Sequence, residues 1–462
     1  MGKFVLGIDS STQSVKAVLV DAESGEVVDQ ASTGHPAGTE VDPAAWTDAL
    51  DAVVGGLLPR ASAVAVAGQQ HGMVALDAEG AVVRPALLWN DNRSAEAAQT
   101  LIEELGGVQR CAEQIGSVLV ASFTSTKLRW MRDHEPDNAA RTSTVLLPHD
   151  YLTRHLSAGR GTHATDRSDA SGTGYWSPAT NDWVPELAES ALGHAIDLPT
   201  LGRPDQPVGE TDAGALLGPG TGDNAGAALG LDLRPGKTLV SLGTSGVAST
   251  ISAATTADPT GMVTGFADAT GQYLPLSCTI NCARILESVA GWLAVDYDEL
   301  ARLALASQPG AGGVRLLPYL DGERTPNRPH ARATFDGLST TTTREQLARA
   351  AYEALLCALA DATGALDRAT GVTTTEVTMI GGAARSEAIR ALAPTILGVP
   401  VTVPEAGEYV ARGAARQAAW MLTGDAEPPQ WAEPAARVFD GEPTPEVLEA
   451  YRDLRDRTAD WR

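Results

Sequence analysis

The sequence predicts an α/β protein. Two segments read as strand, turn and strand: residues 4–20, where apolar runs flank a polar turn, and residues 238–250, where a β-rich run enters a Gly-Thr-Ser-Gly turn. The clearest helix follows Thr343, which forms a T-x-x-Q capping box with Gln346 and precedes apolar residues at helical spacing. A further strand is predicted over residues 377–380, before two glycines. Strands and helices therefore alternate along the chain.

The two hairpins indicate two related lobes. The chain has 462 residues, enough for two or three domains at roughly 150 residues each. The hairpins lie too far apart for a solenoid repeat. We expect a first lobe over residues 1–233 and a second over residues 234–462, with a ligand shared by the two turns; the alternative is a chance pairing of two ordinary hairpins. The Pro-, Gly- and Asp-rich stretch at residues 198–222 is expected to be an irregular loop.

The composition disfavours several classes of partner. Lys and Arg number 34 against 58 Asp and Glu, a formal net charge of −24, whereas nucleic acids and anionic membranes require clustered positive charge. Hydrophobic residues make up 43% and charged residues 20%, the balance of a soluble globular protein. No apolar run approaches the ~18 residues that span a bilayer. An anionic ligand must therefore rely on backbone amides and a divalent metal.

The sparse cysteines favour a reducing compartment. There are four, Cys111, Cys278, Cys282 and Cys357, and the apolar run after Met1 is too short for a signal peptide. We expect a cytoplasmic protein with reduced thiols. Cys278 and Cys282 have the spacing of metal ligands, but no second Cys or His pair follows, so buried thiols are preferred over a zinc site.

Two turns carry groups suited to phosphate. Asp9 ends the first strand beside hydroxyls and is able to hold a hydrated Mg²⁺, because this ion takes few protein ligands; an Asx turn is the simpler alternative. In the second turn, Gly243, Thr244 and Ser245 offer amides and hydroxyls for an anion nest, although a plain hairpin turn uses the same residues. No Walker loop occurs in the sequence.

Asp223 begins a predicted helix after a glycine-rich run. Residues 220–226 loosely match a dinucleotide fingerprint, but no clear strand precedes them and no acidic residue lies about 20 positions on, so that interpretation fails. Asp223 is either a helix N-cap or a general base at the mouth of a tightly packed helix. Gly382 and Ala383, after the strand at residues 377–380, leave room for a flat ring such as adenine, although close helix packing selects the same small residues.

Two segments suit a polyhydroxyl substrate. Gln70 and His71 lie between glycines directly after a strand predicted at residues 64–67, where an amide and an imidazole offer donors and acceptors. Trp89 precedes amides, a carboxylate and an arginine, and an aromatic face beside polar groups is typical of sugar binding. A hydrogen-bonded loop histidine and a buried tryptophan beside an ion pair are the structural alternatives.

Taken in order, these segments resemble the FGGY family of carbohydrate kinases, within the actin-like ATPase superfamily. The pattern S-x-T-x-x-K-L-x-W-M-x-D-H at residues 122–134 resembles the first family signature. The pattern A-x-F-x-G-L, followed after seven residues by Q-L-x-x-A-A-Y-E, resembles the second over residues 333–353. The resemblance covers about residues 4–420. It implies a two-lobed, ribonuclease H-like fold with an active-site cleft between the lobes.

Within the family, the segments around Gln70, Trp89, Ser168 and Asp223 most resemble xylulokinases. This implies Mg²⁺-assisted phosphoryl transfer from ATP to the 5-hydroxyl of D-xylulose, with Asp223 as the general base and Asp9 as the metal and phosphate ligand. The residues implied to contact the sugar, besides Asp223, are Gln70, His71, Trp89 and Asn224. The residues implied to bind ATP are Thr12, Gly243, Thr244, Ser245, Gly382 and Ala383.

The resemblance leaves alternatives open. One or two changed contacts would suit a kinase for another pentulose or polyol, such as ribulose or ribitol. Gln70 stands where Met is often expected, and Ala383 replaces the third glycine of the usual run. A chaperone of the same superfamily would need a further β-rich domain, for which too few residues follow position 420, and a filament protein would not need the sugar-binding segments. A homodimer is compatible with the sequence.

Overall fold

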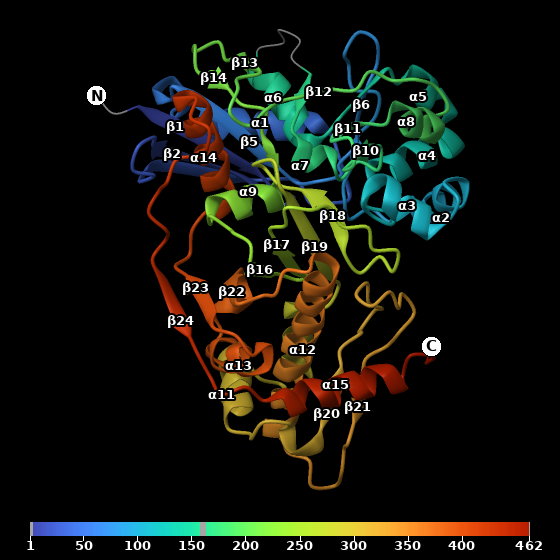
Figure 1. The fold of residues 1–462 in the computed structure, drawn as a ribbon, viewed down its shortest axis with the longest axis vertical. Coiled ribbons are helices and arrows are strands. Elements are labelled where there is room, and N and C mark those ends of the chain that lie inside the picture. The colour runs from blue at the N-terminus through green and yellow to red at the C-terminus, as the bar shows by residue number, and fades with distance from the viewer. Residues whose placement is uncertain (1–2, 158–162, 462) are drawn as a thin grey trace.

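Two mixed β-sheets form the framework of the computed structural model, which describes residues 3–157 and 163–461. In Figure 1 the first sheet lies in the upper part of the molecule and the second in the lower part. Within the described residues each sheet has seven strands. The predicted two-lobed α/β fold is therefore confirmed.

Three parallel strands of the first sheet have their carboxyl ends side by side, at one edge of the sheet. Its strands are β1 (Phe4–Ser10), β2 (Ser14–Asp21), β3 (Val27–Gly34), β5 (Ala63–Gly68), β13 (Gly209–Glu210), β14 (Leu216–Leu217) and β15 (Thr221–Gly222). β1 forms a hairpin with β2 and runs parallel to β5, which in turn runs parallel to β15. Ser10 lies opposite Gly68, and Gly68 lies opposite Gly222. The segments that follow β1, β5 and β15 therefore start side by side.

The second sheet repeats this arrangement. Its strands are β16 (Lys237–Leu242), β17 (Gly246–Thr250), β18 (Thr264–Ala267), β19 (Tyr273–Thr279), β22 (Glu376–Ile380), β23 (Val401–Pro404) and β24 (Ala436–Phe439). β16 forms a hairpin with β17 and runs parallel to β22, as β1 does with β2 and β5. The turns at residues 9–12 and 243–246 thus occupy equivalent places in the two lobes.

Helices cover both sheets. Those encoded in the first half of the chain are α1 (Pro43–Val54), α2 (Ala95–Glu104), α3 (Val108–Ile115), α4 (Thr124–His134), α5 (Pro136–Arg141), α6 (Pro148–Leu156), α7 (Arg167–Ala170), α8 (Pro185–Leu192) and α9 (Asp223–Gly230). The others are α10 (Ala283–Leu293), α11 (Tyr297–Leu305), α12 (Arg344–Thr370), α13 (Glu387–Leu397), α14 (Tyr409–Thr423) and α15 (Pro445–Arg457). Short 3₁₀ turns are η1 (Leu58–Arg60), η2 (Ala311–Gly313) and η3 (Gly382–Arg385). The remaining short strands are β4 (Glu40–Val41), β6 (Val74–Leu76), β7 (Ala86–Leu87), β8 (Thr144–Leu146), β9 (Ala164–Thr165), β10 (Trp176–Ser177), β11 (Asp182–Trp183), β12 (Thr200–Leu201), β20 (Arg315–Leu317) and β21 (Thr334–Asp336).

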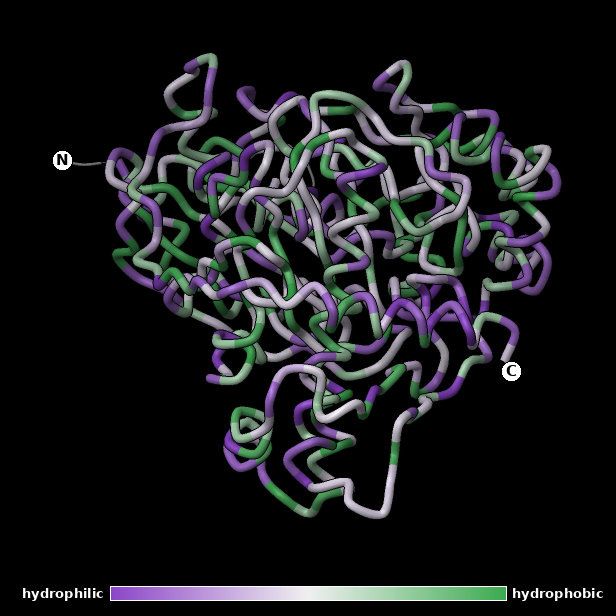
Figure 2. Tube along the Cα trace, turned by 60° about the horizontal axis from the view of Figure 1, so that its bottom comes forward, coloured by the Kyte–Doolittle hydropathy of each residue, from purple (hydrophilic) through white to green (hydrophobic). Residues whose placement is uncertain are grey.

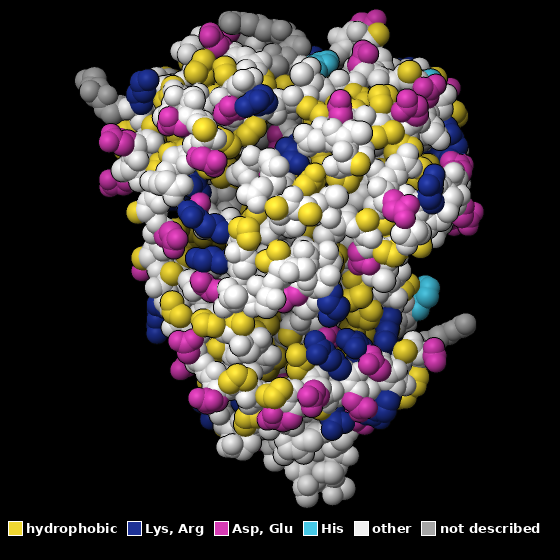
Figure 3. Space-filling model, in the orientation of Figure 1, with side chains coloured by type: hydrophobic (Ala, Val, Ile, Leu, Met, Phe, Trp, Pro, Cys, Tyr) yellow, Lys and Arg dark blue, Asp and Glu magenta, His cyan; other side chains and the backbone are white. Residues whose placement is uncertain are grey.

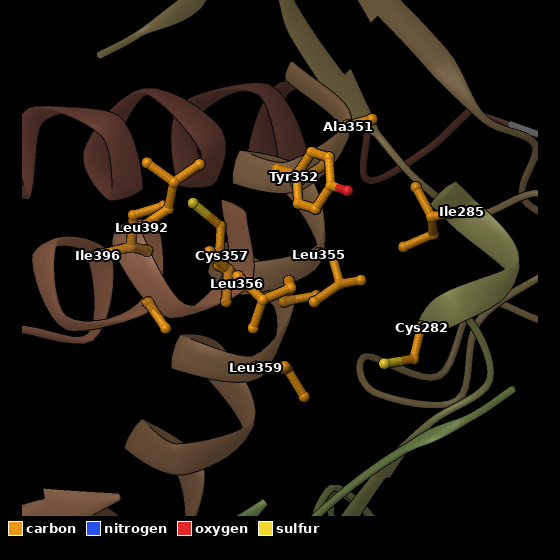
Figure 4. Packing of buried hydrophobic residues seen from close by; sticks show 14 of the residues in the cluster. Cys282, Ile285, Ala351, Tyr352, Leu355, Leu356, Cys357, Leu359, Leu392 and Ile396 are labelled. Atoms are coloured by element: carbon orange, nitrogen blue, oxygen red, sulfur yellow. The ribbon is translucent and has the colours of Figure 1, made fainter. Parts of the chain in front are cut away.

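The core of the second lobe is built around α12. The predicted capping box is present: the Gln346 backbone N donates to Thr343 Oγ1, and the Thr343 N donates to Gln346 Oε1. Figure 4 shows Tyr352, Leu355 and Leu356 among the apolar side chains that meet those of α10 and α13. At the outer surface, α15 buries only the stripe Val447, Tyr451 and Leu454, and its tube is largely hydrophilic in Figure 2.

The stretch at residues 198–222 is not the irregular loop expected from its composition. It contains β12, β13, β14 and β15, each two residues long. Strands this short show no hydrophobic period, so a pattern-based prediction misses them. β15 matters most, because it places the start of α9 at the shared edge of the first sheet.

Helix α14 lies in the second half of the sequence but packs on the first sheet. Ala411, Ala414, Ala415 and neighbouring alanines form one buried cluster with residues of β1, β2 and β5. Its contact with α9 is nearly backbone to backbone, because a Cβ atom on Gly413 would overlap the carbonyl oxygen of Gly226. Figure 1 shows α14 beside β1 and β2, whereas β24 and α15, which follow it, lie with the second lobe. The chain thus crosses between lobes on both sides of α14.

Candidate active site

Two carboxylates lie at the shared strand edge. Asp9, near the end of β1, is buried, and Ser11 Oγ donates to its Oδ1 at 2.6 Å. Asp223 follows β15 directly and opens α9, half-buried. Its Oδ1 accepts hydrogen bonds from the backbone N and the Nδ2 of Asn224, at 2.7 and 2.8 Å. The strand pairing, not proximity in sequence, brings these groups together.

The surroundings of both carboxylates favour protonation. Burial raises the pKa of Asp9 to about 6. Burial first, and then the charges of Asp9 and Asp169, raise the pKa of Asp223 to about 7. A carboxyl group with a pKa near the working pH is partly ionised and still basic, which is the condition for general-base catalysis.

Gln70 and Asn224 meet beside Asp223, and His71 follows Gln70 in the chain. Asn224 Nδ2 donates to Gln70 Oε1 at 3.1 Å. His71, in the left-handed region with φ of +68°, contacts Gly172 O through Nδ1 at 2.6 Å. Because a carbonyl only accepts, Nδ1 carries the proton, and burial lowers the pKa of His71 to about 3. The imidazole is therefore neutral, and Nε2 is an acceptor.

Trp89 extends this polar surface. Its indole is 38% exposed, and its Nε1 donates to Thr12 Oγ1 at 2.8 Å. Thr12 Oγ1 in turn donates to Gln69 Oε1 at 3.3 Å. The structure thus joins the Thr12 side chain, predicted on the ATP side, to the tryptophan predicted on the sugar side.

A groove of about 550 Å³ runs from Asp9 to the second lobe. From the first lobe it is lined by Asp9, Ser11 and Lys16. From the second half of the chain its lining includes Ser241, Gly381, Gly382, Ala384 and residues 404–410. The Ala383 side chain is not part of this lining among the described residues, because it packs against the core of the second lobe.

The turn at residues 243–246 presents free amides. Gly243 and Thr244 are exposed, and their carbonyls accept hydrogen bonds from the backbone N of Ala283 and Cys282 at 3.0 and 3.1 Å. Within the part of the chain that the structure describes, the backbone N–H groups of Thr244 and Ser245 have no hydrogen-bond partner. A turn with anchored carbonyls and outward amides suits an anion.

Sequence reasoning missed a lysine at the mouth of the groove. Lys16 lies directly opposite Asp9 in the β1–β2 hairpin, and its Nζ pairs with Glu408 Oε2 at 2.7 Å. Both side chains are partly exposed to solvent. A lysine inside the otherwise apolar run of residues 15–20, in hairpin register with Asp9, was the signal that could have found it.

The donor set at Asp9 fits a hydrated divalent ion. In residues 3–157 and 163–461, no group of three or more His, Cys, Asp or Glu side chains is arranged to hold a metal. A divalent ion held by the Asp9 carboxylate alone would keep most of its water, as Mg²⁺ does in phosphate sites. Across the same residues, no helix is both long and apolar enough to cross a membrane.

Comparisons with known proteins give the family. The models for the N-terminal and C-terminal domains of the FGGY family of carbohydrate kinases match residues 4–224 and 238–422. A xylulose kinase of Streptomyces coelicolor is 47% identical over 95% of this chain and 93% of its own, and one of Streptomyces rubiginosus is 44% identical over 99% and 95%. The crystal structure of xylulose kinase from Bifidobacterium adolescentis has a TM-score of 0.92 at 47% identity, covering 98% of this chain and 99% of that one. The chain belongs to the FGGY family of carbohydrate kinases, with their actin-like ATPase fold.

Proposed function

We propose that this kinase transfers the terminal phosphoryl group of ATP to the 5-hydroxyl of D-xylulose. Relatives that align over nearly the whole chain are named as xylulose kinases, which supports this substrate. The observation that carries the proposal is the position of Asp223. Its carboxylate accepts a hydrogen bond from the Asn224 amide, which also donates to Gln70, and it lies close enough to the buried Asp9 for their charges to interact.

Asp223 acts as the general base. It accepts the proton of the 5-hydroxyl as that oxygen bonds to the terminal phosphorus and the bond from phosphorus to the leaving oxygen of ADP breaks. A base of this kind contributes ~10²–10⁴-fold, about 3–5 kcal/mol of the barrier. The larger share comes from alignment and from charge stabilisation of the transferring group.

The sugar binds between the end of β5 and the start of α9. Gln70 and Asn224 donate to and accept from its hydroxyls through amides that already contact each other at 3.1 Å. His71 Nε2 accepts a hydrogen bond from a sugar hydroxyl, since Nδ1–H already donates to Gly172 O. The exposed face of Trp89 covers the carbon skeleton, as aromatic rings do in sugar sites.

ATP lies along the groove that Asp9 and Gly382 line, with its phosphates extending to the turn at residues 243–245, which is outside that lining. The amides of the turn formed by Gly243, Thr244 and Ser245 donate to the phosphates, and the Lys16 ammonium adds a positive charge once it leaves Glu408. Gly382 borders the adenosine end. Thr12 and Ala383 contribute through backbone atoms, because their side chains are engaged elsewhere.

Asp9 and Ser11 are the residues that would hold Mg²⁺ through its water shell. Bound there, the ion supplies positive charge that offsets the phosphates and the carboxylates. The fit follows from the Asp9 carboxylate, which is buried beside the Ser11 hydroxyl and the Lys16 ammonium and is able to accept hydrogen bonds from the ion's water shell.

The charge distribution and the thiols support small-molecule partners in the cytoplasm. On the face seen in Figure 3, basic side chains gather in the lower lobe around α15. There Arg452 and Arg455 pair with Asp361, and Arg457 pairs with Asp336, so this group offers little free charge to a polyanion. All four cysteines are free thiols, as a reducing compartment requires.

The deciding experiment is product analysis after incubation with ATP, Mg²⁺ and D-xylulose, followed by a coupled assay over other pentuloses and polyols. We expect D-xylulose 5-phosphate and ADP in equal amounts. Phosphorylation of D-ribulose or ribitol far above that of D-xylulose would overturn the substrate while leaving the kinase chemistry in place.

A further inference from the structure

Four ionisable side chains lie buried behind the sugar-side residues, and the proposed reaction uses none of them. His149, in the first turn of α6, is fully buried, and its Nδ1 lies 2.6 Å from Asp169 Oδ2. Its Nε2 lies 3.1 Å from Asp150 Oδ1 and 3.9 Å from Asp166 Oδ1. Burial disfavours a charged imidazole, but the surrounding carboxylates outweigh it and raise the pKa of His149. A buried cluster of this kind is costly, which calls for a functional explanation.

The backbone closes tightly around His149. Gly68, at the end of β5, and Gly220, just before β15, approach the histidine so closely that a Cβ atom at either position would overlap it. Gly220 has φ of +86°, in the left-handed region that favours glycine. His149 Nε2 also lies 3.2 Å from Pro219 O. The histidine therefore fixes the spacing between the ends of β5 and β15.

The segment that carries the Asp169 carboxylate contacts Gln70, His71 and the residue before α9. Ser168 Oγ accepts a hydrogen bond from the Gly222 backbone N at 3.0 Å, and Ser168 O accepts one from Gln70 Nε2 at 3.3 Å. Gly172 O accepts from His71 Nδ1 at 2.6 Å. A shift of this segment would therefore move Gln70, His71 and the start of α9 together.

We propose that Asp169, held by His149, is a positioning residue of this kinase. The pair anchors residues 166–172 to α6, and that segment sets the sugar contacts and Asp223 in register with each other. Asp169 is fully buried and acts through its neighbours rather than on the substrate. The inference rests on the proposed role of Asp223.

The charge of Asp169 also acts on Asp223. The ionisable groups that act on Asp223 most strongly are Asp9, from β1, and Asp169, from α7, and both raise its pKa. The groups beyond these two are His149, Asp150 and Asp166 behind Asp169, and Lys16 and Glu408 near Asp9. Removing the Asp169 charge lowers the pKa of Asp223, so activity extends to lower pH. A loss of folded protein alone would lower the activity at every pH and would not shift the pH at which the activity falls.

Two substitutions separate geometry from charge. Asp169→Asn keeps an acceptor for His149 Nδ1–H but loses the charge, and Asp169→Ala loses both. We expect Asp169→Ala to lower kcat by about tenfold or more through misalignment, and Asp169→Asn to lower it far less. Both variants should shift the acid limb of the kcat/KM profile to lower pH. The matched control is Asp51→Asn, which removes the charge of the exposed His155–Asp51 pair and should change neither quantity.

Several outcomes would overturn the positioning role. One is an acid limb that stays in place in Asp169→Asn. Another is a loss of activity in Asp169→Ala that circular dichroism attributes wholly to unfolded protein while Asp169→Asn is normal in every respect. If the wild-type protein does not use D-xylulose, the profiles are recorded with the sugar it does phosphorylate. A wrong assignment of the substrate is then distinguished from a wrong assignment of the role of Asp169.

Discussion

At the scale of single residues, three carboxylates lie close together in the proposed site, to which the proposed reaction brings a negative phosphoryl group. Asp223 is flanked by Asp9 and Asp169, and together with burial their charges raise its pKa to about 7. Since a carboxyl group with a raised pKa binds protons more tightly when folded, ionised Asp223 destabilises the protein. That cost grows as the pH rises from about 4 and is complete above about 7. Basicity is thus obtained at the expense of stability.

Replacing the base separates these two effects. Asp223→Asn should keep the fold, raise Tm at a pH above about 7 because repulsion is relieved, and lower kcat by ~10²–10⁴-fold. A coupled assay and thermal denaturation measure both quantities. Normal turnover would return Asp223 to a helix-terminus role.

The pH profile of the wild-type enzyme should report the same group. Because the proposed base must be unprotonated, kcat/KM should fall as the pH drops below about 7. His71 does not contribute to this limb, since its pKa lies near 3. The residual activity of Asp223→Asn should lack the limb, and a limb that persists in that variant would assign it to another residue.

Asp9→Asn tests the metal role. The amide cannot attract the hydrated ion as a carboxylate does. The Mg²⁺ concentration that gives half-maximal activity should therefore rise at least about tenfold. Titrating Mg²⁺ at fixed ATP measures this shift. Ser14→Ala, in the same hairpin, is the control and should leave the requirement unchanged, whereas an unchanged requirement in Asp9→Asn would remove Asp9 from the metal site.

At the scale of elements, the sequence predicts helices and strands that carry a local signal, but it does not predict which strands pair. The capped helix α12 and the strands entering residues 9–12, 243–246 and 381–383 carry periodicity or capping chemistry within a few residues. β15 has two residues and no period, yet it brings Asp223 to the edge where Asp9 lies. The candidate residues could therefore be proposed from their residue types. Their position next to one another depends on the strand pairing, which the sequence does not predict.

Three further contacts lacked any local pattern. Lys16 and Glu408 are separated by 392 residues, so neither predicts the other. Helix α14 is rich in alanine around its circumference, and such a helix gives no indication of the lobe on which it packs. The Asp169–His149 pair was missed for the same reason, because its members become neighbours only when α6 and α7 pack together.

The packing of α9 on α14 can be tested with one methyl group. Gly413→Ala should destabilise the protein by about 1–3 kcal/mol or more, because the new Cβ overlaps Gly226 O, and should lower kcat by displacing Asp223. Denaturant unfolding and the coupled assay measure the two effects. Gly291→Ala, in α10 with no atom near its Cβ position, should be neutral or stabilising by about 0.5–1 kcal/mol. Equal stability of both variants would contradict the close packing.

At the scale of the whole molecule, the groove is assembled from both lobes. Asp9 and Lys16 belong to the first lobe and Gly382 to the second. The lobes also meet through Arg167 and Asp268, whose charged groups lie 3.3 Å apart. A ligand that contacts both walls should therefore favour a closed arrangement that excludes water from the transferring group.

Scattering in solution tests this closure. The radius of gyration should fall when D-xylulose and a non-hydrolysable ATP analogue bind together, and less with either alone. Identical scattering profiles for the unliganded protein, the protein with either ligand and the protein with both would rule out a large movement. Asp223→Asn serves as a control, since it should close normally while failing to turn over.

The course of α14 across the lobes also bears on biosynthesis. The sheet that begins at Phe4 is completed by β15, yet the helix that seals its alanine-lined face starts at Tyr409. At about 5–20 residues per second, a ribosome needs roughly 10–40 s to make the intervening chain. During that interval the nascent first lobe exposes an apolar surface. A polypeptide released before α14 is made would keep that surface uncovered and would be prone to aggregation rather than forming an independent domain.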